Sequence, residues 1–513
     1  MSTLLAGTLL LTATGLFSQV VGFVYRMFLS RLIGAETMGL YQLVMPAYSM
    51  LMSVTAVGLT VAVSTLSARY HALGDSGTVR QILRRALGGF LLLAVPLGIA
   101  VAALSDPISV YLLGDARTRL GVVLLVPCVL LTGVENLHKH CFYGIGRVRP
   151  PAAVETAEQL IRAAAVLGLL AALLPRSAEE TVGIIVLGMV LCEVFSACAL
   201  TLLFQRHWRQ FPPEPARDQV GRRRLFAIAL PVGATSLLGT VLGCANSVLI
   251  PAKLVEGGME LSEAMSEFGV LCGMTLPLLA LPTGFIGALC LVMVPDLSRR
   301  TAKGDNRAAA GFLDRVMSAT SLLMAPAMAL LAVAGPTIGR AMFRDPRVGE
   351  LILPLAVGTL LGCWQSVLSG ALNGLGLQGK GARNAILSDA AQLAFTFFAV
   401  PKWGLAGFAV GFVASGLVGA GLNLASVLRA AGLRTRWFRW FVRPLLAAVF
   451  MGLWCNLFFH ILLDGGWGEG WAAACCALLG LVLYAAALLA QGLSVTVVFA
   501  RFRTGLWGRR CAP

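Results

Sequence analysis

Eight ionisable side chains interrupt stretches of the sequence that are otherwise apolar and long enough to cross a lipid bilayer. A charged group is costly in hydrocarbon, so a charge in such a stretch indicates a bound ligand, a partner of opposite charge or a transported ion. Glu158 and Arg162 are one helical turn apart, which places them on one face as an ion pair. The eight residues are Arg26, Arg31, Glu135, Glu155, Glu158, Arg162, Glu193 and Asp389.

These side chains favour two kinds of chemistry. Arginine binds phosphate groups through forked donors, so the charges of the N-terminal half are predicted to contact an anionic substrate. The predicted substrate-binding residues are Arg26, Arg31, Glu135, Glu158 and Arg162. Glu193 and Asp389 each interrupt an apolar helix and are predicted to couple transport to an ion. The structural alternatives are a self-neutralising Glu158–Arg162 pair, arginines that reach the lipid headgroups, and carboxyl groups that hydrogen-bond a neighbouring helix.

Other chemical signatures do not stand out in the sequence. The 12 cysteines lack metal-ligand spacing, and the five histidines do not group with carboxylates as a catalytic cluster would. We therefore predict no metal, no cofactor and no enzymatic activity. Short basic loops facing anionic lipid account for the net charge of +16, so a nucleic-acid partner is not expected.

The composition determines which elements must hold these charges. Hydrophobic residues make up 58% of the chain and charged residues only 12%, which is too few to cover a soluble protein. The apolar runs are continuous, so they predict membrane helices rather than a barrel. Breaking the runs at charge clusters gives about fourteen spans. The spans are 4–25, 38–66, 86–105, 118–138, 152–174, 181–204, 225–250, 267–294, 316–334, 349–372, 384–400, 403–428, 444–463 and 471–495.

Basic residues alternate between the loops in a way that predicts the topology. With the N-terminus in the cytoplasm, most of the 40 lysines and arginines fall in cytoplasmic loops or in the C-terminal tail. A missed or an extra helix would invert the later loops and destroy this bias. We therefore predict a multi-pass protein of the cytoplasmic membrane with both termini in the cytoplasm.

The chain also repeats itself at a separation of 230 residues. Gly74-Asp75 recurs as Gly304-Asp305, Asp115 as Asp345, and Gly144-x-Gly146 as Gly374-x-Gly376. Six helices separate the copies, so both halves should have the same orientation and be related by a pseudo-twofold axis along the membrane normal. The predicted parts are a first six-helix lobe, a basic linker, a second lobe and two extra helices with a basic tail, at residues 1–204, 205–224, 225–428 and 429–513.

Several motifs resemble those of a known family. Residues 30–46 (SRLIGAETMGLYQLVMP), 135–146 (ENLHKHCFYGIG) and 276–283 (LPLLALPT) are similar to the stage V sporulation protein B family. That family belongs to the multidrug/oligosaccharidyl-lipid/polysaccharide superfamily. The essential peptidoglycan-lipid flippases carry arginines where this chain has Gln19 and Tyr25, which implies a less cationic cavity, with Arg26 in place of one of them.

The resemblance implies a flippase that moves a lipid-linked oligosaccharide or peptidoglycan precursor across the membrane by alternating access. The implied substrate is of the undecaprenyl-pyrophosphate type and serves spore cortex or cell-wall synthesis. Membrane lipids and cell-wall synthesis proteins are the other expected partners. Two alternatives stay open at this point, namely a cation-coupled multidrug exporter of the same superfamily and a non-transporting scaffold of cell-wall assembly.

Overall fold

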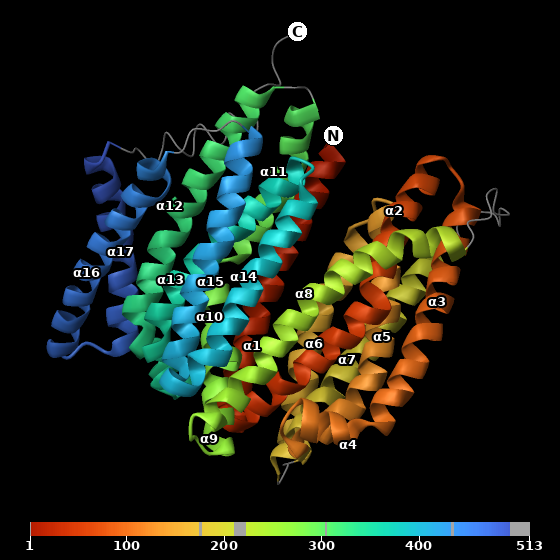
Figure 1. Cartoon of the computed structure of the whole chain (residues 1–513), viewed down its shortest axis with the longest axis horizontal. Coiled ribbons are helices and arrows are strands. Elements are labelled where there is room, and N and C mark those ends of the chain that lie inside the picture. Colours follow the sequence, from red (N-terminus) through yellow and green to blue (C-terminus); the bar gives the residue numbers. More distant parts are fainter. Residues whose placement is uncertain (1, 174–176, 210–221, 303–304, 432–435, 493–513) are drawn as a thin grey trace. The chain divides into compact units, whose positions relative to one another are not determined.

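The described part of the chain consists of helices joined by short turns and contains no strand (Figure 1). The structure is a computed structural model that describes residues 2–173, 177–209, 222–302, 305–431 and 436–492. Continuous apolar segments satisfy their backbone amides within each helix, so the all-α expectation is confirmed. Eleven of the described helices are long and apolar enough to cross a membrane.

The chain divides into two compact units. Unit 1 is Met1–Gly269 and unit 2 is Val270–Pro513. The α-helices of unit 1 are α1 (Ser2–Met52), α2 (Gly58–Ala72), α3 (Ser76–Ala103), α4 (Ser105–Pro107), α5 (Arg119–Gly144), α6 (Arg149–Leu173), α7 (Ala178–Arg209), α8 (Arg222–Glu256) and α9 (Leu261–Phe268). Short π or 3-10 segments lie between them, namely η1 (Ser53–Val57), η2 (Ile108–Leu112) and η3 (Ala116–Thr118).

Unit 2 continues the same style of helical packing. It begins within η4 (Gly269–Thr275). Its α-helices are α10 (Leu276–Ala280), α11 (Gly284–Ala302), α12 (Asn306–Ile338), α13 (Arg347–Gly374), α14 (Gln378–Phe398), α15 (Val400–Ala431), α16 (Arg443–Asp464) and α17 (Glu469–Ala490). The π segments η5 (Gly339–Phe343) and η6 (Phe438–Val442) precede α13 and α16. Helix α15 packs against α13 and α14, and α16 packs against α12 and α17.

The predicted spans fall on these helices, but the predicted count of fourteen stays a prediction. The first two spans lie on α1, η1 and α2, which run on from one another with one sharp change of direction at Gly34. Two other spans are not among the eleven apolar candidates, namely those on 261–302 and 378–398. The first is interrupted by π and turn residues, and the second carries a stripe of polar side chains.

Matching turns support the 230-residue repeat. Asp75 and Asp305 cap α3 and α12, each accepting a backbone N–H three residues later at 2.9 Å. Asp115 accepts the backbone N–H of Arg117 at 2.9 Å, and Asp345 that of Arg347 at 3.0 Å. Each arginine also donates its Nη2 to the aspartate of its own turn at 2.7 Å. The proposed axis between the halves stays a prediction.

Helix α8 packs within unit 1, although the repeat assigns residues 225–250 to the second lobe. Gly58 of α2 approaches α8 so closely that a Cβ there would lie 2.2 Å from the carbonyl oxygen of Ala229. The packing therefore groups α8 with the helices before it. The lobe boundaries inferred from the repeat remain a prediction about the duplicated sequence.

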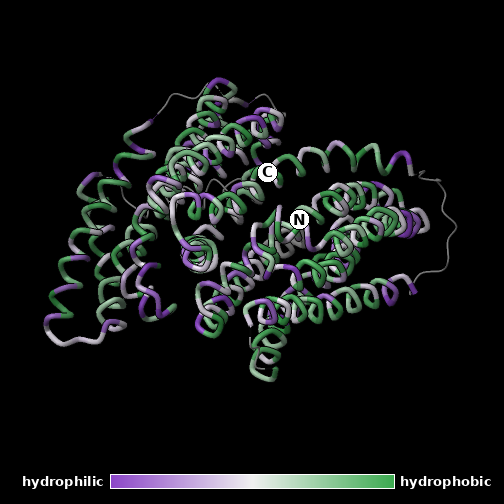
Figure 2. Tube along the Cα trace, turned by 60° about the horizontal axis from the view of Figure 1, so that its bottom comes forward, coloured by the Kyte–Doolittle hydropathy of each residue, from purple (hydrophilic) through white to green (hydrophobic). Residues whose placement is uncertain are grey.

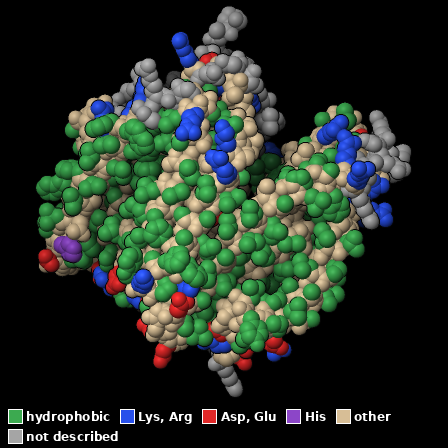
Figure 3. All heavy atoms as spheres, in the orientation of Figure 1, with side chains coloured by type: hydrophobic (Ala, Val, Ile, Leu, Met, Phe, Trp, Pro, Cys, Tyr) green, Lys and Arg blue, Asp and Glu red, His purple; other side chains and the backbone are tan. Residues whose placement is uncertain are grey.

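The distribution of side chains suits a bilayer. Figure 2 shows helices that are hydrophobic along most of their length, with hydrophilic residues at many of their ends. On the face seen in Figure 3, hydrophobic side chains cover the middles of the helices and many of the basic side chains lie near helix ends. This pattern and the eleven apolar helices indicate a multi-pass membrane protein.

Candidate functional site

Four carboxyl groups and two cations from α5, α6 and α7 come together inside unit 1. We name this set the charged centre. Its residues are Glu135, Lys139, Glu155, Glu158, Arg162 and Glu193. The centre unites four of the sequence-predicted site residues, Glu135, Glu158, Arg162 and Glu193, in one place.

Arg162 connects α6 to α7 at the middle of this centre. Its Nη2 donates to Glu158 Oε1 one turn earlier on α6 and to Glu193 Oε1 at 3.2 Å on α7. Its Nε donates to Cys192 Sγ at 3.4 Å. Glu158 and Glu193 are buried, with side-chain exposures of 7% and 3%. The predicted Glu158–Arg162 ion pair is thus present, and Glu193 joins it.

A second ion pair extends the centre along α5. Lys139 Nζ lies 3.1 Å from Glu155 Oε2. Glu135 is one turn before Lys139 on α5, is buried, and lies close enough to Glu193, Lys139 and Arg162 to interact with their charges. Lys139 thereby places a positive charge beside the buried carboxyl groups and reduces their mutual repulsion, while it is paired with Glu155.

Local packing explains why these side chains meet. The four-residue spacing of Glu158 and Arg162 places both on the same face of α6. Gly188 allows α7 to approach that helix, because a Cβ there would lie 2.6 Å from Val166 Cγ2. Glu193 follows Gly188 by somewhat more than one turn and therefore reaches Arg162.

Three groups of the centre have the right types for metal ligands. Ligand atoms of Glu158, Cys192 and Glu193 lie within 4.8 Å of one another. However, the Arg162 guanidinium donates to all three of them and so holds the place that a metal cation would take. The arrangement suits a protein-borne cation rather than a bound metal ion.

Comparison with known proteins assigns this helical scaffold to a family. Residues 4–300, more than half of the chain, match the family described as polysaccharide biosynthesis protein. The chain belongs to this family. Stage V sporulation protein B of Bacillus subtilis (strain 168) is 25% identical over 439 residues, which cover 84% of this chain and 83% of that protein. Lipid II flippase MurJ of the same organism is 26% identical over 170 residues, 31% of each chain.

Solved structures show the same fold. Lipid II flippase MurJ in an inward closed conformation matches with a TM-score of 0.71 and 13% identity, covering 97% of this chain and 99% of that one. An inward-facing multidrug resistance MATE transporter matches with a TM-score of 0.61 and 14% identity, covering 82% of this chain and 96% of that one. The expected polytopic helical fold is confirmed.

The two predicted arginines of α1 are not among the six residues that define the charged centre. Arg26 is half-buried and lies near Tyr25 and Tyr41, two tyrosines that also interact with the charge of Arg162. Arg31 is half-buried and precedes Gly34, where α1 changes direction with a φ of 76°. Arg26 therefore lies near the charged centre, whereas Arg31 lies toward the bend.

A second polar network lies in unit 2 and contains no charge. We name it the amide centre, and it consists of Gln365, Asn384, Ser388, Gln392, Ser415 and Asn423. Asn384 Nδ2 donates to Asn423 Oδ1 at 3.0 Å, and Asn423 Nδ2 donates to the Gln365 carbonyl at 3.2 Å. Ser415 Oγ donates to Gln392 Oε1 at 3.0 Å. The predicted ion-coupling residue Asp389 is exposed on α14, beside the buried stripe that carries this network.

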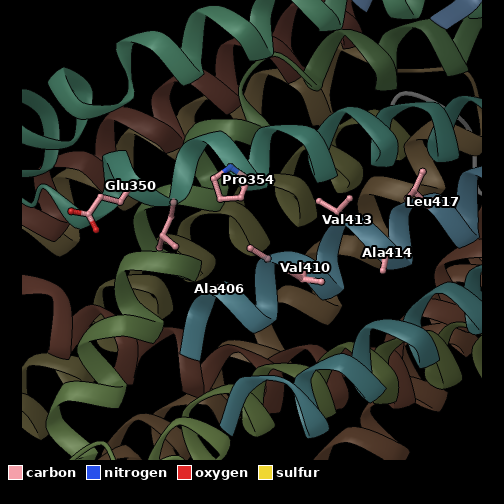
Figure 4. A pocket seen from close by; sticks show the side chains of 9 residues that line it. Glu350, Pro354, Ala406, Val410, Val413, Ala414 and Leu417 are labelled. Carbon is pink, nitrogen blue, oxygen red and sulfur yellow. The ribbon is translucent and has the colours of Figure 1, made fainter. Parts of the chain in front are cut away.

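Apolar pockets are also present in each unit. In unit 1, α1, α3 and α8 line a cavity of about 600 Å³ whose walls are almost entirely hydrocarbon, with Met50, Leu97 and Val241 among them. In unit 2, α13 and α15 line a cavity of about 540 Å³ that has Glu350 at one end (Figure 4). Such surfaces suit hydrocarbon chains rather than polar headgroups.

Sequence reasoning missed two parts of these sites. The predicted span 118–138 ends just before Lys139, whereas α5 continues to Gly144 and places Lys139 beside Glu155. The spacing of Glu135 and Lys139, one turn apart, is the signal that would have found it. The amide centre carries no charge and so does not interrupt an apolar run, although Ser388, Gln392 and Thr396 recur every four residues on α14.

Proposed function

We propose that this protein is a flippase that moves a lipid-linked oligosaccharide or peptidoglycan precursor across the cytoplasmic membrane by alternating access, for spore cortex or cell-wall synthesis. The observation that carries the proposal is the match to stage V sporulation protein B over 84% of the chain, on a scaffold built twice from the same turns. Duplicated, like-oriented bundles are the framework on which alternating access operates. The name of the MurJ relative supports a lipid-linked substrate.

The substrate proposed is of the undecaprenyl-pyrophosphate type. Its pyrophosphate requires cationic donors. We assign headgroup contact to Arg26 and Arg31 of α1, with Glu135, Glu158 and Arg162 as the polar surroundings, where Arg162 bonds two carboxylates. The apolar pocket of unit 1 offers a hydrocarbon surface for part of the prenyl chain.

The proposed topology follows from the loop charges. Both termini lie in the cytoplasm, where the basic loops face anionic lipid. The substrate enters from the cytoplasmic leaflet, where its headgroup is made, and membrane lipids surround the helices. Cell-wall synthesis proteins that use the flipped precursor are the proposed protein partners.

A multidrug exporter is the alternative that a specific observation favours. The MATE transporter shares the fold at a TM-score of 0.61. A drug exporter and a flippase both need alternating access, but they differ in cargo. A non-transporting scaffold needs no movement, so it predicts full function from a chain whose halves are cross-linked.

The decisive experiment is reconstitution of the full chain in vesicles that contain a fluorescent prenyl-pyrophosphate sugar. Flipping is measured as the loss of fluorescence that an impermeant quencher causes on one leaflet. We expect flipping by the wild type and a loss of at least about tenfold in Arg26→Ala and Arg31→Ala, equivalent to about 1.4 kcal/mol of substrate interaction. The matched control is Arg206→Ala, an exposed arginine at the end of α7.

The outcomes separate the alternatives. Unchanged flipping in both α1 variants would remove these arginines as headgroup ligands. Absence of flipping together with efflux of a cationic drug would identify a multidrug exporter. Complementation of cell-wall growth by a cross-linked, non-flipping chain would identify a scaffold.

A further inference from the structure

The charged centre and the amide centre occupy the same positions of the two halves. Four residues of the charged centre have counterparts in the amide centre that lie 230 residues later, which is also the separation between the two capped turns. The counterparts also lie on corresponding helices, because α5, α6 and α7 match α13, α14 and α15. The pairs are Glu135 and Gln365, Glu158 and Ser388, Arg162 and Gln392, and Glu193 and Asn423.

The amide centre shows that this position packs without charge. Asn423 and Gln392 each hydrogen-bond across to a neighbouring helix, and Ser388 Oγ donates to the Ser415 carbonyl at 2.8 Å. A buried ion pair is rarely needed for stability alone, since uncharged groups that pack well replace it at little cost. The charges of unit 1 therefore indicate a task that the neutral copy does not perform.

The charge balance of the charged centre is not zero. It holds four carboxyl groups and two cations, and Arg26 beside Tyr25 and Tyr41 is a third cation nearby. With every group ionised, one negative charge is left over. A net charge is costly inside a membrane protein, so one further positive charge is favoured there.

An orphaned oxygen marks where that charge belongs. Glu193 is 2% exposed, and its Oε2 has no hydrogen-bond partner among the described residues. Glu135 lies beside it and carries the same charge. Thr132 also lies beside Glu193, but its hydroxyl donates to the Cys128 carbonyl at 2.9 Å. A hydrogen atom on one carboxyl group would bond the other and satisfy Oε2.

We infer that the charged centre binds one transported proton, held between Glu135 and Glu193, and that the amide centre cannot. The inference rests on the proposed function as a transporter. The proton comes from water on one side of the membrane, adds to a carboxylate oxygen, and returns to water on the other side, with no other bond made or broken. Arg162 already bonds both Glu158 and Glu193, which leaves a proton rather than a metal ion as the missing charge.

Other ionisable groups surround Glu193 and set the conditions of its titration. Helix α6 contributes Glu158 and Arg162, and α7 itself contributes Cys192. Helix α5 contributes Cys128, Glu135 and Lys139, and Glu155 of α6 lies beyond Lys139. Helix α1 contributes Tyr25, Arg26, Tyr41 and Tyr48. Arginine and lysine ordinarily keep their charge across the neutral range, so the carboxyl groups are the ones able to exchange a proton.

The first test observes the proton directly. Infrared difference spectra of the purified full chain are recorded as the pH rises through neutrality, and the carbonyl band of a protonated carboxyl group is followed. We expect one band that disappears with a single-proton titration and is absent from both Glu135→Gln and Glu193→Gln. The exposed Glu263→Gln is the matched control and should keep the band.

The second test transplants the neutral centre. A variant with Glu135→Gln, Glu158→Ser, Arg162→Gln and Glu193→Asn carries in unit 1 the residues that already pack in unit 2. With a fluorescent prenyl-pyrophosphate sugar in vesicles, the wild-type rate should change by about tenfold per pH unit on the limb where the proton is lost. The transplanted variant should show no dependence on pH or on a pH gradient.

Each result decides the matter. A carboxyl band that persists in both single variants, or a transplanted variant with the pH dependence of the wild type, would overturn the inference. Loss of the band on addition of sodium ions at constant pH would show a metal-cation site instead. Flipping that is independent of pH in the wild type would refute proton coupling but leave the proposed flippase intact, whereas absence of flipping would refute the flippase itself.

Discussion

Replacing Arg162 by glutamine should destabilise unit 1 far more than the size of the change suggests. The substitution leaves Glu158 and Glu193 buried at side-chain exposures of 7% and 3% without the cation that bonds both. Removing one partner of a buried ion pair costs about 3–5 kcal/mol, because the remaining charge stays out of water. We expect a loss of this size in the free energy of unfolding.

The cost of Arg162→Gln can be compared with that of a substitution at the equivalent position of the amide centre. Gln392 is the counterpart of Arg162; it accepts a neutral hydrogen bond from Ser415 at 3.0 Å and donates to Thr396 Oγ1 only at the long distance of 3.5 Å. Its replacement by methionine should cost about 1 kcal/mol, the net value of one such bond. The transplanted variant that neutralises all four positions of the charged centre should recover most of the loss caused by Arg162→Gln.

The assay is reversible unfolding of the full chain in mixed micelles with a rising fraction of denaturing detergent. Arg162→Gln, Gln392→Met and the transplanted variant are measured beside the wild type. A cost of about 1 kcal/mol for Arg162→Gln, equal to that of Gln392→Met, would refute the view that Arg162 is an essential buried counter-charge. A transplanted variant no more stable than Arg162→Gln would show that the two centres do not pack alike.

Three further predictions concern other parts of the chain. Gly34→Ala should cost about 1–3 kcal/mol in the same unfolding assay, since a φ of 76° with a ψ of 173° is accessible almost only to glycine; a change below about 0.5 kcal/mol would contradict the strained bend. Asp345→Asn should cost about 1 kcal/mol. Burial favours the neutral acid, but the hydrogen bonds from Arg347 outweigh burial and lower the pKa of Asp345. Its stabilisation is therefore full above the unfolded-state pKa of about 3.9 and is lost as the pH falls through the lower folded-state pKa, which unfolding measured against pH would show. Asp389→Asn should leave gradient-driven flipping within about twofold of wild type, because the exposed Asp389 lies outside both centres; a loss of coupling would return it to the pathway.

Composition and apolar length predicted the helical membrane fold because both follow from the cost of unsatisfied backbone in lipid. The ends of the helices were less accessible. Charged residues such as Lys139 were placed in loops, yet α5 carries this lysine inward to pair with Glu155. The sequence shows the one-turn spacing of Glu135 and Lys139, but it does not show that Glu155 of the next helix is the partner of Lys139.

The bend at Gly34 was missed for a related reason. The sequence there suggested a loop between two spans, whereas the chain turns at one glycine and continues as helix. Only a residue without a side chain adopts this backbone conformation at low cost, and glycines are too frequent among these helices to single one out.

The two halves agree at their turns and differ at their centres, and this contrast locates the specialised chemistry. Asp115 with Arg117 and Asp345 with Arg347 form the same capped turn, because a turn of given backbone geometry needs the same donors and acceptors wherever it occurs. At the centres the backbone demands nothing of the side chains, and there one copy carries charges while the other carries amides. A shared scaffold with unequal centres is expected if both halves must move together but only one carries a proton. Introducing the carboxylates of unit 1 at Gln365 and Asn423 should therefore create a second titrating pair without disturbing the turns.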